Sequence, residues 1–501
     1  MTQTTVSDTI LEKRFKRGRH FEKAPRSGQI DEIDILRKLF EIVKEYREEP
    51  QQTDFVEYRT PHELNQLLNL EQNEGQASWD QMFKWVEQYL KYSVRTNHPR
   101  FLNRMWSGAN LPSIVGEVIA AISNTSAGTF ESAPVSTLME KYMIQRMLDL
   151  VDFPEGEGQM TTGSSNANMI AMMTARNRVN TNIKKDGLFA GKELYAFVSQ
   201  DAHYSLDKAA NILGIGTKHL IKIPVNKCGQ MDLQALEEKL SNVENQGGVP
   251  FFVCATAGTT VRGAYDPIKG LLELKKKYDF WLHVDGAWGG AAIFSNKLRN
   301  QYLQGIEEVD SFTWDFHKMA GTALICNVLL VKNGDALKES VQVGDTSYIY
   351  GKDNEDDDIN LGSLSLQCGR RADSLKWFLD WNYYGQQGLA SRIESYLKLC
   401  EVSERLINQY PELEMVVPRE SFNVCFRFVV PDGISSNEFN ENLRNQLHRL
   451  QIGLIGSGYI GDEYCLRLLI ANPDIDQEAL ELFFQELISE GNHLLGQTWT
   501  S

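Results

Sequence analysis

Short apolar runs rich in β-branched residues alternate with stretches of helical spacing through the middle of the chain. The runs predict strands at residues 194–199, 219–223, 249–255, 280–284, 311–314 and 323–331. Between several of them, segments such as 232–242 and 267–278 repeat their apolar residues with the period of a helix. Strands that alternate with helices favour an α/β fold with a mostly parallel, doubly wound sheet.

The flanking regions follow other patterns. Residues 1–30 lack any period and indicate a loose arm, whereas 33–46, 80–93, 113–123 and 135–150 are spaced as helices. Near the C-terminus, helical stretches at 372–384, 389–409, 436–450 and 476–494 accompany apolar runs at 422–430 and 464–471. We therefore expect a helical N-terminal segment at 1–95, a large domain at 96–375 and a small α+β domain at 376–501.

Composition and charge exclude several classes of protein. With 501 residues, 42% hydrophobic and 24% charged, the chain has the balance of a globular protein of more than one domain. Its net charge of −16 comes without a basic stripe, so we expect no nucleic-acid partner. The polar N-terminus is no secretory signal and no apolar run is long enough for a bilayer, so we expect a cytoplasmic protein without membrane association. Its seven cysteines form no CxxC pair, and we expect neither disulfides nor a metal site.

Three segments of the predicted large domain combine residue types that suit one chemistry. They are Thr161–Asn168 before a helix, His283–Gly290 at the end of a strand, and Asp315–Lys318 after another strand. Each has an ordinary explanation alone, because such residues also form helix caps, turns and solvated surface. In open α/β sheets, however, ligands bind at the carboxyl ends of the strands, where these three segments can meet.

Together the segments suit pyridoxal phosphate. The small residues Gly163, Ser164 and Ser165 open a helix whose free N–H groups and dipole favour a phosphate. A carboxylate such as Asp285 can pair with a pyridine nitrogen and keep it protonated. The amine of Lys318 can form a Schiff base with the cofactor's aldehyde.

Residues from about 98 to 475 resemble the group II pyridoxal-phosphate-dependent amino-acid decarboxylases, of PLP fold type I, which is aspartate aminotransferase-like. Within that group the chain is most similar to the branch of glutamate and cysteine-sulfinate decarboxylases. The segments that carry the resemblance are His98–Phe101, Ala255–Thr260, His283–Gly290, His317–Met319 and Gln367–Arg370.

The resemblance implies a role for each matching residue. Lys318 would be the catalytic Schiff-base lysine, and His203 would stack on the cofactor and take part in catalysis. Arg467 would hold the substrate's α-carboxylate. The other cofactor-binding residues that it implies are Gly163, Ser164, Ser165, Thr259, Asp285, Ala287 and His317.

The segment beside the substrate bears on the choice of amino acid. The resemblance places Phe101, Arg104, Ser126 and Gly128 there. Arg104 stands where animal glutamate decarboxylases carry Gln, and an arginine suits a second acidic group because it binds carboxylate or sulfinate bidentately. We expect cysteine sulfinate or aspartate as substrate, then glutamate, with hypotaurine, β-alanine or GABA and carbon dioxide as products.

The chain departs from the family's pattern in two places. Asp315 and Phe316 replace the usual Asn-Pro before the His-Lys pair, so a polar contact in the site differs. The mobile-loop tyrosine thought to reprotonate Cα falls near Glu355, where the chain has none. Tyr348 and Tyr350 lie nearby in sequence, and we select Tyr350 as the catalytic candidate.

Other activities remain open at this level. An aminotransferase or another PLP lyase would use the same Asp and Lys, an aldehyde-forming decarboxylase would follow from the missing tyrosine, and a PLP-binding protein with little turnover is a further alternative. The resemblance also implies a homodimer in which loops from a second subunit complete each active site.

Overall fold

The computed structural model describes residues 31–48, 54–69, 77–189, 191–344, 349 and 359–498. The expected N-terminal arm and the acidic run at 354–358 lie outside these residues. The chain divides into two compact units, of which one comprises Met1–Thr53 with Glu57–Ser93, and the other Asp54–Val56 with Val94–Ser501. The predicted boundary near residue 375 falls inside the second unit and stays a prediction.

The smaller unit is helical, as its spacing predicts. It contains α2 (Glu32–Glu48), α3 (Pro61–Leu68) and α4 (Trp79–Tyr92). Helix α3 begins with a capping box, in which Thr60 and Glu63 each accept a hydrogen bond from the other's backbone N–H, and Pro61 follows at the first helical position. Lys38 of α2 lies 4.5 Å from the ring centroid of Phe83 in α4. Large side chains such as Phe40 and Tyr89 remain exposed, so this unit buries little by itself.

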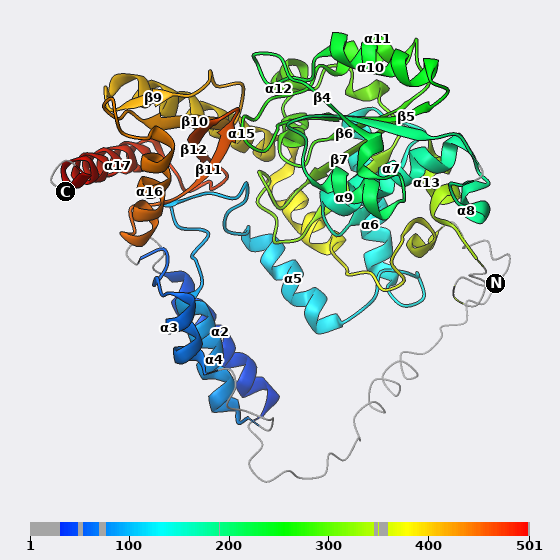
Figure 1. The fold of residues 1–501 in the computed structure, drawn as a ribbon. Coiled ribbons are helices and arrows are strands. Elements are labelled where there is room, and N and C mark those ends of the chain that lie inside the picture. Colours follow the sequence, from blue (N-terminus) through cyan, green and yellow to red (C-terminus); the bar gives the residue numbers. More distant parts are fainter. Residues whose placement is uncertain are drawn as a thin grey trace, which may run out of the picture. The chain divides into compact units, whose positions relative to one another are not determined.

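The larger unit is built on a seven-stranded sheet with the order β2-β8-β7-β6-β5-β3-β4 (Figure 1). Strands β4, β3, β5, β6 and β7 pair in parallel, and β8 is antiparallel to both of its neighbours. The mostly parallel α/β sheet is thus confirmed. Its strands are β2 (Glu157–Thr161), β3 (Leu194–Ser199), β4 (Leu220–Ile223), β5 (Val249–Thr256), β6 (Trp281–Asp285), β7 (Ser311–Asp315) and β8 (Asn327–Val331).

Alternation of side chains along the strands creates a core on each face of this sheet. In β5, Val253 and Ala255 join one cluster of buried residues, whereas Phe252 and Cys254 join the other. Leu236 of α10 (Leu233–Asn245) belongs to the first cluster and Ile170 of α7 (Ser164–Val179) to the second. Because both faces are covered, the strands are apolar runs without polar alternation, which made most of them recognisable.

A second, five-stranded sheet has the order β1-β11-β12-β10-β9. It consists of β1 (Phe101–Leu102), β9 (Leu413–Met415), β10 (Asn423–Phe428), β11 (Leu454–Ile460) and β12 (Glu463–Leu469). The two residues of β1 come from far upstream and pair in parallel with β11. Residues 101–102 therefore pair with β11, which lies next to β12, the strand that contains Arg467.

The remaining helices cover the sheets and connect their strands. Helix α15 contains the two helices predicted at 372–384 and 389–409, with non-helical backbone at Gly385 between them. The helices of the larger unit are α5 (Leu111–Ser123), α6 (Pro134–Val151), α7 (Ser164–Val179), α8 (Ile183–Asp186), α9 (Ser205–Ile212), α10 (Leu233–Asn245), α11 (Ile268–Lys275), α12 (Asn296–Tyr302), α13 (Gly334–Val341), α15 (Ser374–Gln409), α16 (Ser436–Arg449) and α17 (Gln477–Thr498).

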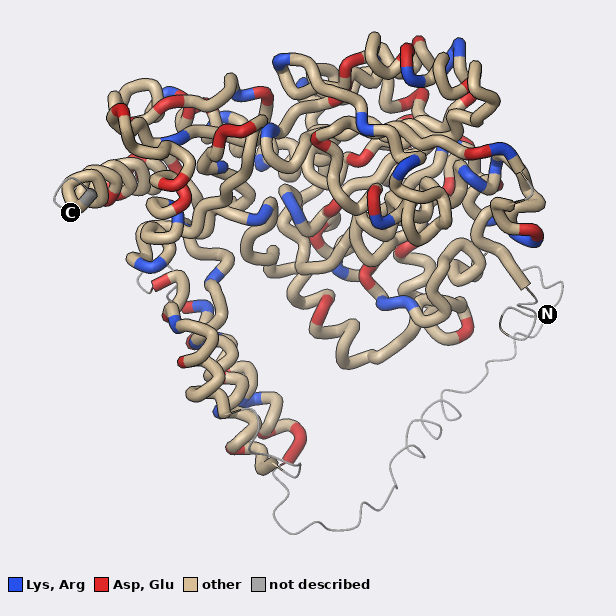
Figure 2. Tube along the Cα trace, in the orientation of Figure 1, with Lys and Arg blue, Asp and Glu red and all other residues tan. Residues whose placement is uncertain are grey.

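The described chain has neither a stripe of one charge nor a helix that could cross a membrane. In Figure 2, Lys and Arg residues of the described chain are interspersed with Asp and Glu rather than gathered into one stripe. Among the described helices, none combines the length and the apolarity that crossing a membrane requires.

Candidate active site

The three predicted segments meet at one edge of the large sheet. Strand β6 ends at Asp285, β7 ends at Asp315, and α7 begins at Ser164 directly after β2. They surround a cavity of about 240 Å³. Eight of the predicted site residues line it, namely Gly163, Ser164, Ser165, His203, Asp285, Ala287, His317 and Lys318. The carboxyl ends of the parallel strands thus form the site, as the topology rule requires.

Asp285 is a buried carboxylate with two neutral donors. Its side chain accepts hydrogen bonds from the Asn168 amide at 2.7 Å and from the backbone N–H of Ala287 at 3.0 Å. The residue is only 4% exposed. Among the described residues, no cation of the protein lies within ion-pair distance of it, so a positive group of a ligand can take that place.

Lys318 lies in the turn after β7, and its ammonium is paired with a carboxylate of the same turn. Its Nζ is 3.1 Å from Asp315, and its side chain is 18% exposed. Asp315 also accepts hydrogen bonds from the backbone N–H and hydroxyl of Ser164, at 3.2 and 3.1 Å, and from Asn327 at 2.7 Å. Burial alone would raise the pKa of Asp315, but the charges of Lys318 and His317 and the hydrogen bonds from Lys318 and Asn327 hold it below its usual value.

The first turn of α7 has the geometry of an anion site. Gly163 precedes the helix with φ +108°, a conformation that residues with a Cβ rarely adopt. Ser164 is buried and Ser165 exposed at the opening. An anion at this turn would meet the free N–H groups and the positive end of the helix dipole.

Two histidines line the same cavity. His203 is half-buried, and burial lowers its pKa, although the nearby Asp285 opposes that shift. The Nδ1 atom of His317 lies 2.8 Å from the carbonyl oxygen of Cys326 and 3.1 Å from its backbone nitrogen. Burial likewise lowers the pKa of His317. Both histidines line the cavity that Lys318 also lines, and their roles toward the cofactor stay predictions.

Thr259 lies outside this cavity. Its hydroxyl accepts a hydrogen bond from the Ala264 N–H at 3.0 Å, which closes the loop that follows β5. It lines an adjacent cavity of about 430 Å³ that shares His203 and Thr260 with the central one. Thr260, its neighbour in sequence, lines both.

Arg467 and the segment 101–104 lie together beside the central cavity. Arg467 is 7% exposed, donates from Nη1 to the Thr260 carbonyl, and has no partner for Nε among the described residues. A Cβ on Gly456 would lie 3.0 Å from Asn103 Oδ1 and 3.1 Å from Arg467 Nε, so this glycine leaves room for both. Burial lowers the pKa of Arg467, and the charge of Arg104 adds to that shift.

The backbone at this edge is unusual. Arg104 and Met105 have φ of +72° and +73°, a region that costs non-glycine residues about 1 kcal/mol or more each. Met105 lines the central cavity, whereas Arg104 is exposed next to it. Phe101 is buried, with its ring 5.5 Å from that of Trp106.

Ser126 and Gly128 do not line the central cavity. The Ser126 hydroxyl accepts from the Arg370 N–H at 3.1 Å, and the Gly128 carbonyl accepts from the Gly362 N–H at 2.8 Å. Both therefore bind to the segment around 360–370. Tyr350 lies outside the described residues. The substrate and catalytic roles of all three stay predictions.

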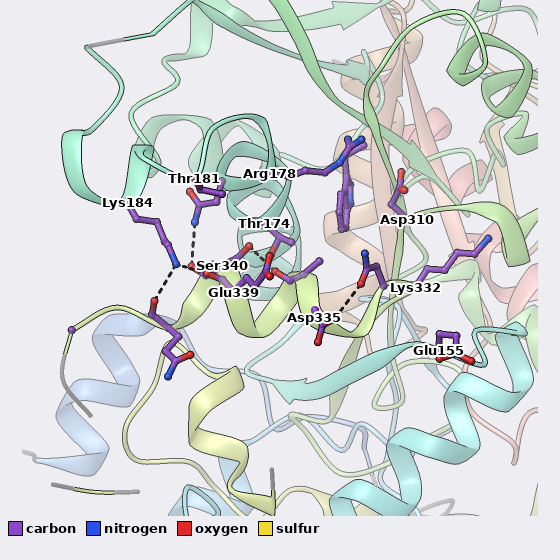
Figure 3. A pocket seen from close by; sticks show the side chains of 16 residues that line it. Glu155, Thr174, Arg178, Thr181, Lys184, Asp310, Lys332, Asp335, Glu339 and Ser340 are labelled. Atoms are coloured by element: carbon purple, nitrogen blue, oxygen red, sulfur yellow. Dashed lines mark hydrogen bonds between the residues drawn. The ribbon is translucent and has the colours of Figure 1, made fainter. Parts of the chain in front are cut away.

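A larger cavity lies elsewhere. It measures about 1080 Å³ and lies at the opposite, amino-terminal edge of the strands, next to Trp281 and Asp310. Figure 3 shows side chains of both charge signs around it, including Arg178, Lys184 and Asp335. Lys184 donates to the carbonyls of Glu339 and Gln342. None of the predicted site residues lines it, so size alone does not identify the active site.

The central cavity is also lined by residues that were not predicted as site residues. The additional lining residues are Met105, Thr162, Thr256, Gly258, Thr260, Trp288, Asp315 and Ile325. Thr256, Gly258 and Trp288 lie inside segments already recognised by resemblance, and their membership of those segments was the available signal. Asn168 belonged to a recognised segment too, but only the structure shows that it touches Asp285.

The donor set suits pyridoxal phosphate. An amine, a buried carboxylate without a protein cation and the first turn of a helix line one cavity among the described residues. Thr256 lines it too, and its buried hydroxyl has no hydrogen-bond partner among the residues that the structure describes. Such an unpartnered polar group is rare in a buried setting and indicates a polar ligand.

Comparisons with known proteins agree with this chemistry. Residues 61–429 match the pyridoxal-dependent decarboxylase conserved domain. The chain is 33% identical to acidic amino acid decarboxylase GADL1 of Mus musculus, over 87% of this chain and 82% of that one. It is 32% identical to the Bos taurus protein of the same name, over 86% and 85%.

Solved structures show the same likeness. Mouse CSAD is 32% identical and superposes with a TM-score of 0.87, covering 92% of this chain and 98% of that one. The Oryza sativa enzyme TDC, solved with PLP and tryptamine, is 23% identical with a TM-score of 0.85 and shares the fold. By its matching domain and by these relatives, the chain belongs to the pyridoxal-dependent decarboxylase family, and it is a PLP-dependent amino-acid decarboxylase.

Proposed function

We propose that this enzyme removes the α-carboxylate of an acidic L-amino acid, in the order cysteine sulfinate or aspartate, then glutamate. The observation that carries the proposal is the meeting of Lys318 and Asp285 in one cavity, with Arg467 and Arg104 at its edge. The similarity to proteins named acidic amino acid decarboxylase and CSAD supports the substrate class.

Each part of the cavity has a task in this proposal. Lys318 would hold the cofactor through its amine, and Asp285 would keep a proton on the ring nitrogen. Gly163, Ser164, Ser165 and His317 would bind the phosphate, while His203 and Ala287 would enclose the ring. When bound, pyridoxal phosphate supplies a protonated ring that accepts the electron pair left on Cα as carbon dioxide departs.

The protein's own contribution is orientation. A guanidinium can bind a carboxylate through two parallel hydrogen bonds, and the unpartnered Nε of Arg467 is available for one of them. Arg467 would hold the α-carboxylate so that the bond to be broken stands perpendicular to the cofactor ring. Fixing that geometry lowers the entropic part of the barrier. For the proton that returns to Cα, Tyr350 remains our candidate.

A panel of amino acids tests the proposal. The purified holoenzyme is incubated with cysteine sulfinate, aspartate, glutamate, diaminobutyrate and tyrosine, and released carbon dioxide, keto acid and aldehyde are measured. We expect stoichiometric carbon dioxide and amine from the acidic substrates. Keto acid without carbon dioxide would instead identify an aminotransferase, an aldehyde would identify the oxidative side reaction, and no product with any substrate would favour a binding protein.

Arg104 is expected to decide between acidic substrates. In the variant Arg104→Gln, kcat/KM for cysteine sulfinate and aspartate should fall about 10- to 100-fold, because a charged hydrogen bond to the second acidic group is lost. The value of kcat/KM for glutamate should fall less, because animal glutamate decarboxylases carry Gln at this position. The measurement is kcat/KM for the three substrates, with Arg100→Gln as a matched arginine, which pairs with Glu486 away from the cavity. An equal loss for all three substrates would remove Arg104 from substrate selection.

Asp315 is expected to slow cofactor loading. Its carboxylate occupies the N–H and hydroxyl of Ser164 and binds the Lys318 ammonium, so it opposes an incoming phosphate and engages the amine. Asp315→Asn keeps the acceptor oxygen but removes the charge. We expect pyridoxal phosphate to bind the apoenzyme about 3- to 10-fold faster, in line with one screened charge pair. Slower loading, followed by absorbance in stopped flow, would contradict this reading of the contact.

The second subunit is also part of the proposal. On α5, Leu111, Val115, Ile119 and Ile122 are 47–66% exposed and follow one another at helical spacing. The opposite side of α5 packs against α15, where a Cβ on Gly116 would lie 2.9 Å from the Lys376 Cα. An exposed apolar stripe of this kind marks a protein–protein contact. We propose that a second copy covers it and brings Ser126 and Gly128 to the neighbouring active site.

Sedimentation velocity tests this arrangement. The enzyme is expected to sediment as a dimer, and Ile119→Glu should shift it towards monomer and lower the activity per subunit at least tenfold at equal concentration. Leu482→Glu, on the exposed side of α17, is the matched control and should stay dimeric. A fully active monomer would exclude shared sites. As a location we propose the cytoplasm, since all seven cysteines are free thiols.

A further inference from the structure

A series of hydrogen-bonded side chains extends from Trp281 to Asp285, next to the central cavity. The Trp281 indole donates to the Ser311 hydroxyl at 2.7 Å, and that hydroxyl lies 2.8 Å from His283 Nδ1. His283 Nε2 lies 2.9 Å from the Asn168 carbonyl oxygen, and the Asn168 amide donates to Asp285 Oδ2 at 2.7 Å. All five residues are buried.

The carboxylate at one end and a neutral histidine in the middle determine the direction of the hydrogen bonds between them. A carboxylate can only accept, so Asn168 turns its amide nitrogen to Asp285 and its carbonyl oxygen to His283. His283 therefore carries its proton on Nε2 and donates to the Asn168 oxygen. The neutral ring then accepts at Nδ1 from the Ser311 hydroxyl, whose oxygen accepts from the indole. The reverse direction would place the amide oxygen against the carboxylate.

The histidine in the middle is neutral. His283 has no exposed surface, and burial lowers its pKa to about 4, although the charge of Asp285 opposes the shift. Asn168 also donates to the Ser205 hydroxyl at 3.1 Å, so its amide group has all of its principal partners. The network is therefore fully directed and carries no net positive charge to Asp285.

We propose that Asn168 and His283 are positioning residues that hold the Asp285 carboxylate in the orientation in which it meets the cofactor's ring nitrogen. This inference rests on the proposed role of Asp285. Asn168 binds one carboxylate oxygen and the Ala287 N–H binds the other, so the carboxylate cannot rotate. Because neither donor is charged, the cation that Asp285 lacks in the protein is supplied by the ring.

The test compares two buried asparagines of the same helix. Asn168→Leu removes the donor to Asp285, whereas Asn177→Leu removes a donor to the Ser340 carbonyl, away from the cavity. Both should lower the melting temperature of the apoenzyme. Only Asn168→Leu is expected to raise the dissociation constant for pyridoxal phosphate, by about 10- to 100-fold, the range for loss of a hydrogen bond to a charged group. It should also change the absorbance spectrum of the bound cofactor towards that of Asp285→Asn.

The histidine supplies an independent pair of variants. His283→Gln keeps a donor near the Nε2 position and is expected to retain cofactor affinity within about threefold, whereas His283→Leu should resemble Asn168→Leu. These variants also decide the matter if Asn168→Leu does not fold. If Asn168→Leu and His283→Leu kept the normal affinity and spectrum while Asp285→Asn lost them, the positioning role would be wrong. If Asp285→Asn itself changed neither, the proposed role of Asp285 would fail first.

Discussion

Replacing Lys318 by alanine is expected to abolish carbon dioxide release, with kcat lower by about 10³- to 10⁶-fold, the scale seen when a covalent group is removed from an active site. Lys318 is the only lysine among the described residues that line the central cavity, and its amine already faces that cavity from the turn after β7. Among the described residues of the cavity, no other amine can take over its attachment to the cofactor.

The measurement is single-turnover release of labelled carbon dioxide from cysteine sulfinate by the reconstituted variant. Lys332→Ala is the control, because Lys332 lines the large cavity at the opposite edge of the sheet. That variant should keep normal activity. A Lys318→Ala enzyme that remained within tenfold of the normal rate would show that the chemistry proceeds elsewhere.

Replacing Asp285 by asparagine is expected to lower kcat by about 10²- to 10³-fold, as when one preorganised charged group is lost from a site. Asparagine has the same shape and can still accept one of the two hydrogen bonds that Asp285 receives, so the site should keep its form. The negative charge that keeps the ring nitrogen protonated is lost, and with it the ring's capacity to accept electrons. We expect kcat to change far more than KM.

Steady-state kinetics together with the absorbance spectrum of the bound cofactor measures this effect. Asp380→Asn provides the control for loss of a buried carboxylate, since Asp380 accepts from Asn110, Thr322 and the Ser113 N–H outside the cavity. It should lower stability but not change the spectrum. An Asp285→Asn enzyme with unchanged kcat would mean that the ring nitrogen has another partner.

Most of the large sheet could be predicted from sequence because its strands are buried on both faces. Strand β3 was predicted at its observed bounds, and β5, β6 and β7 within one residue of theirs. Strand β2, Glu157–Thr161, was missed because Glu-Gly-Gln-Met-Thr is neither apolar nor strictly alternating. Strand β11 escaped for a related reason, since its Gly456 and Gly458 have low strand propensity.

The centre of the site could be predicted because its chemistry demands particular residue types. An amine, a carboxylate at a strand end and a glycine-serine helix start leave few alternatives once they occur in order. Contacts between distant segments could not be foreseen. Asn168 looked like one more residue of the phosphate loop, and Asp315 like a changed polar contact, until the structure placed them on Asp285 and Lys318.

The substrate side was less accessible to sequence reasoning. Arg467 and the segment at 101–104 are brought together by the pairing of β1 with β11 and of β11 with β12, and neither β1 nor β11 was predicted. Ser126 and Gly128 lie against the segment around 360–370, and their place near substrate rests on the second subunit that we propose.

One chemical experiment addresses the central claim most directly. The holoenzyme is reduced with sodium borohydride, digested with trypsin and analysed by mass spectrometry for peptides that carry the reduced cofactor. The structure predicts one modified site, on the peptide containing Lys318. The Asp285→Asn enzyme is expected to carry the label on the same peptide. Modification of a different lysine, or of none, would contradict the assignment of this cavity as the active site.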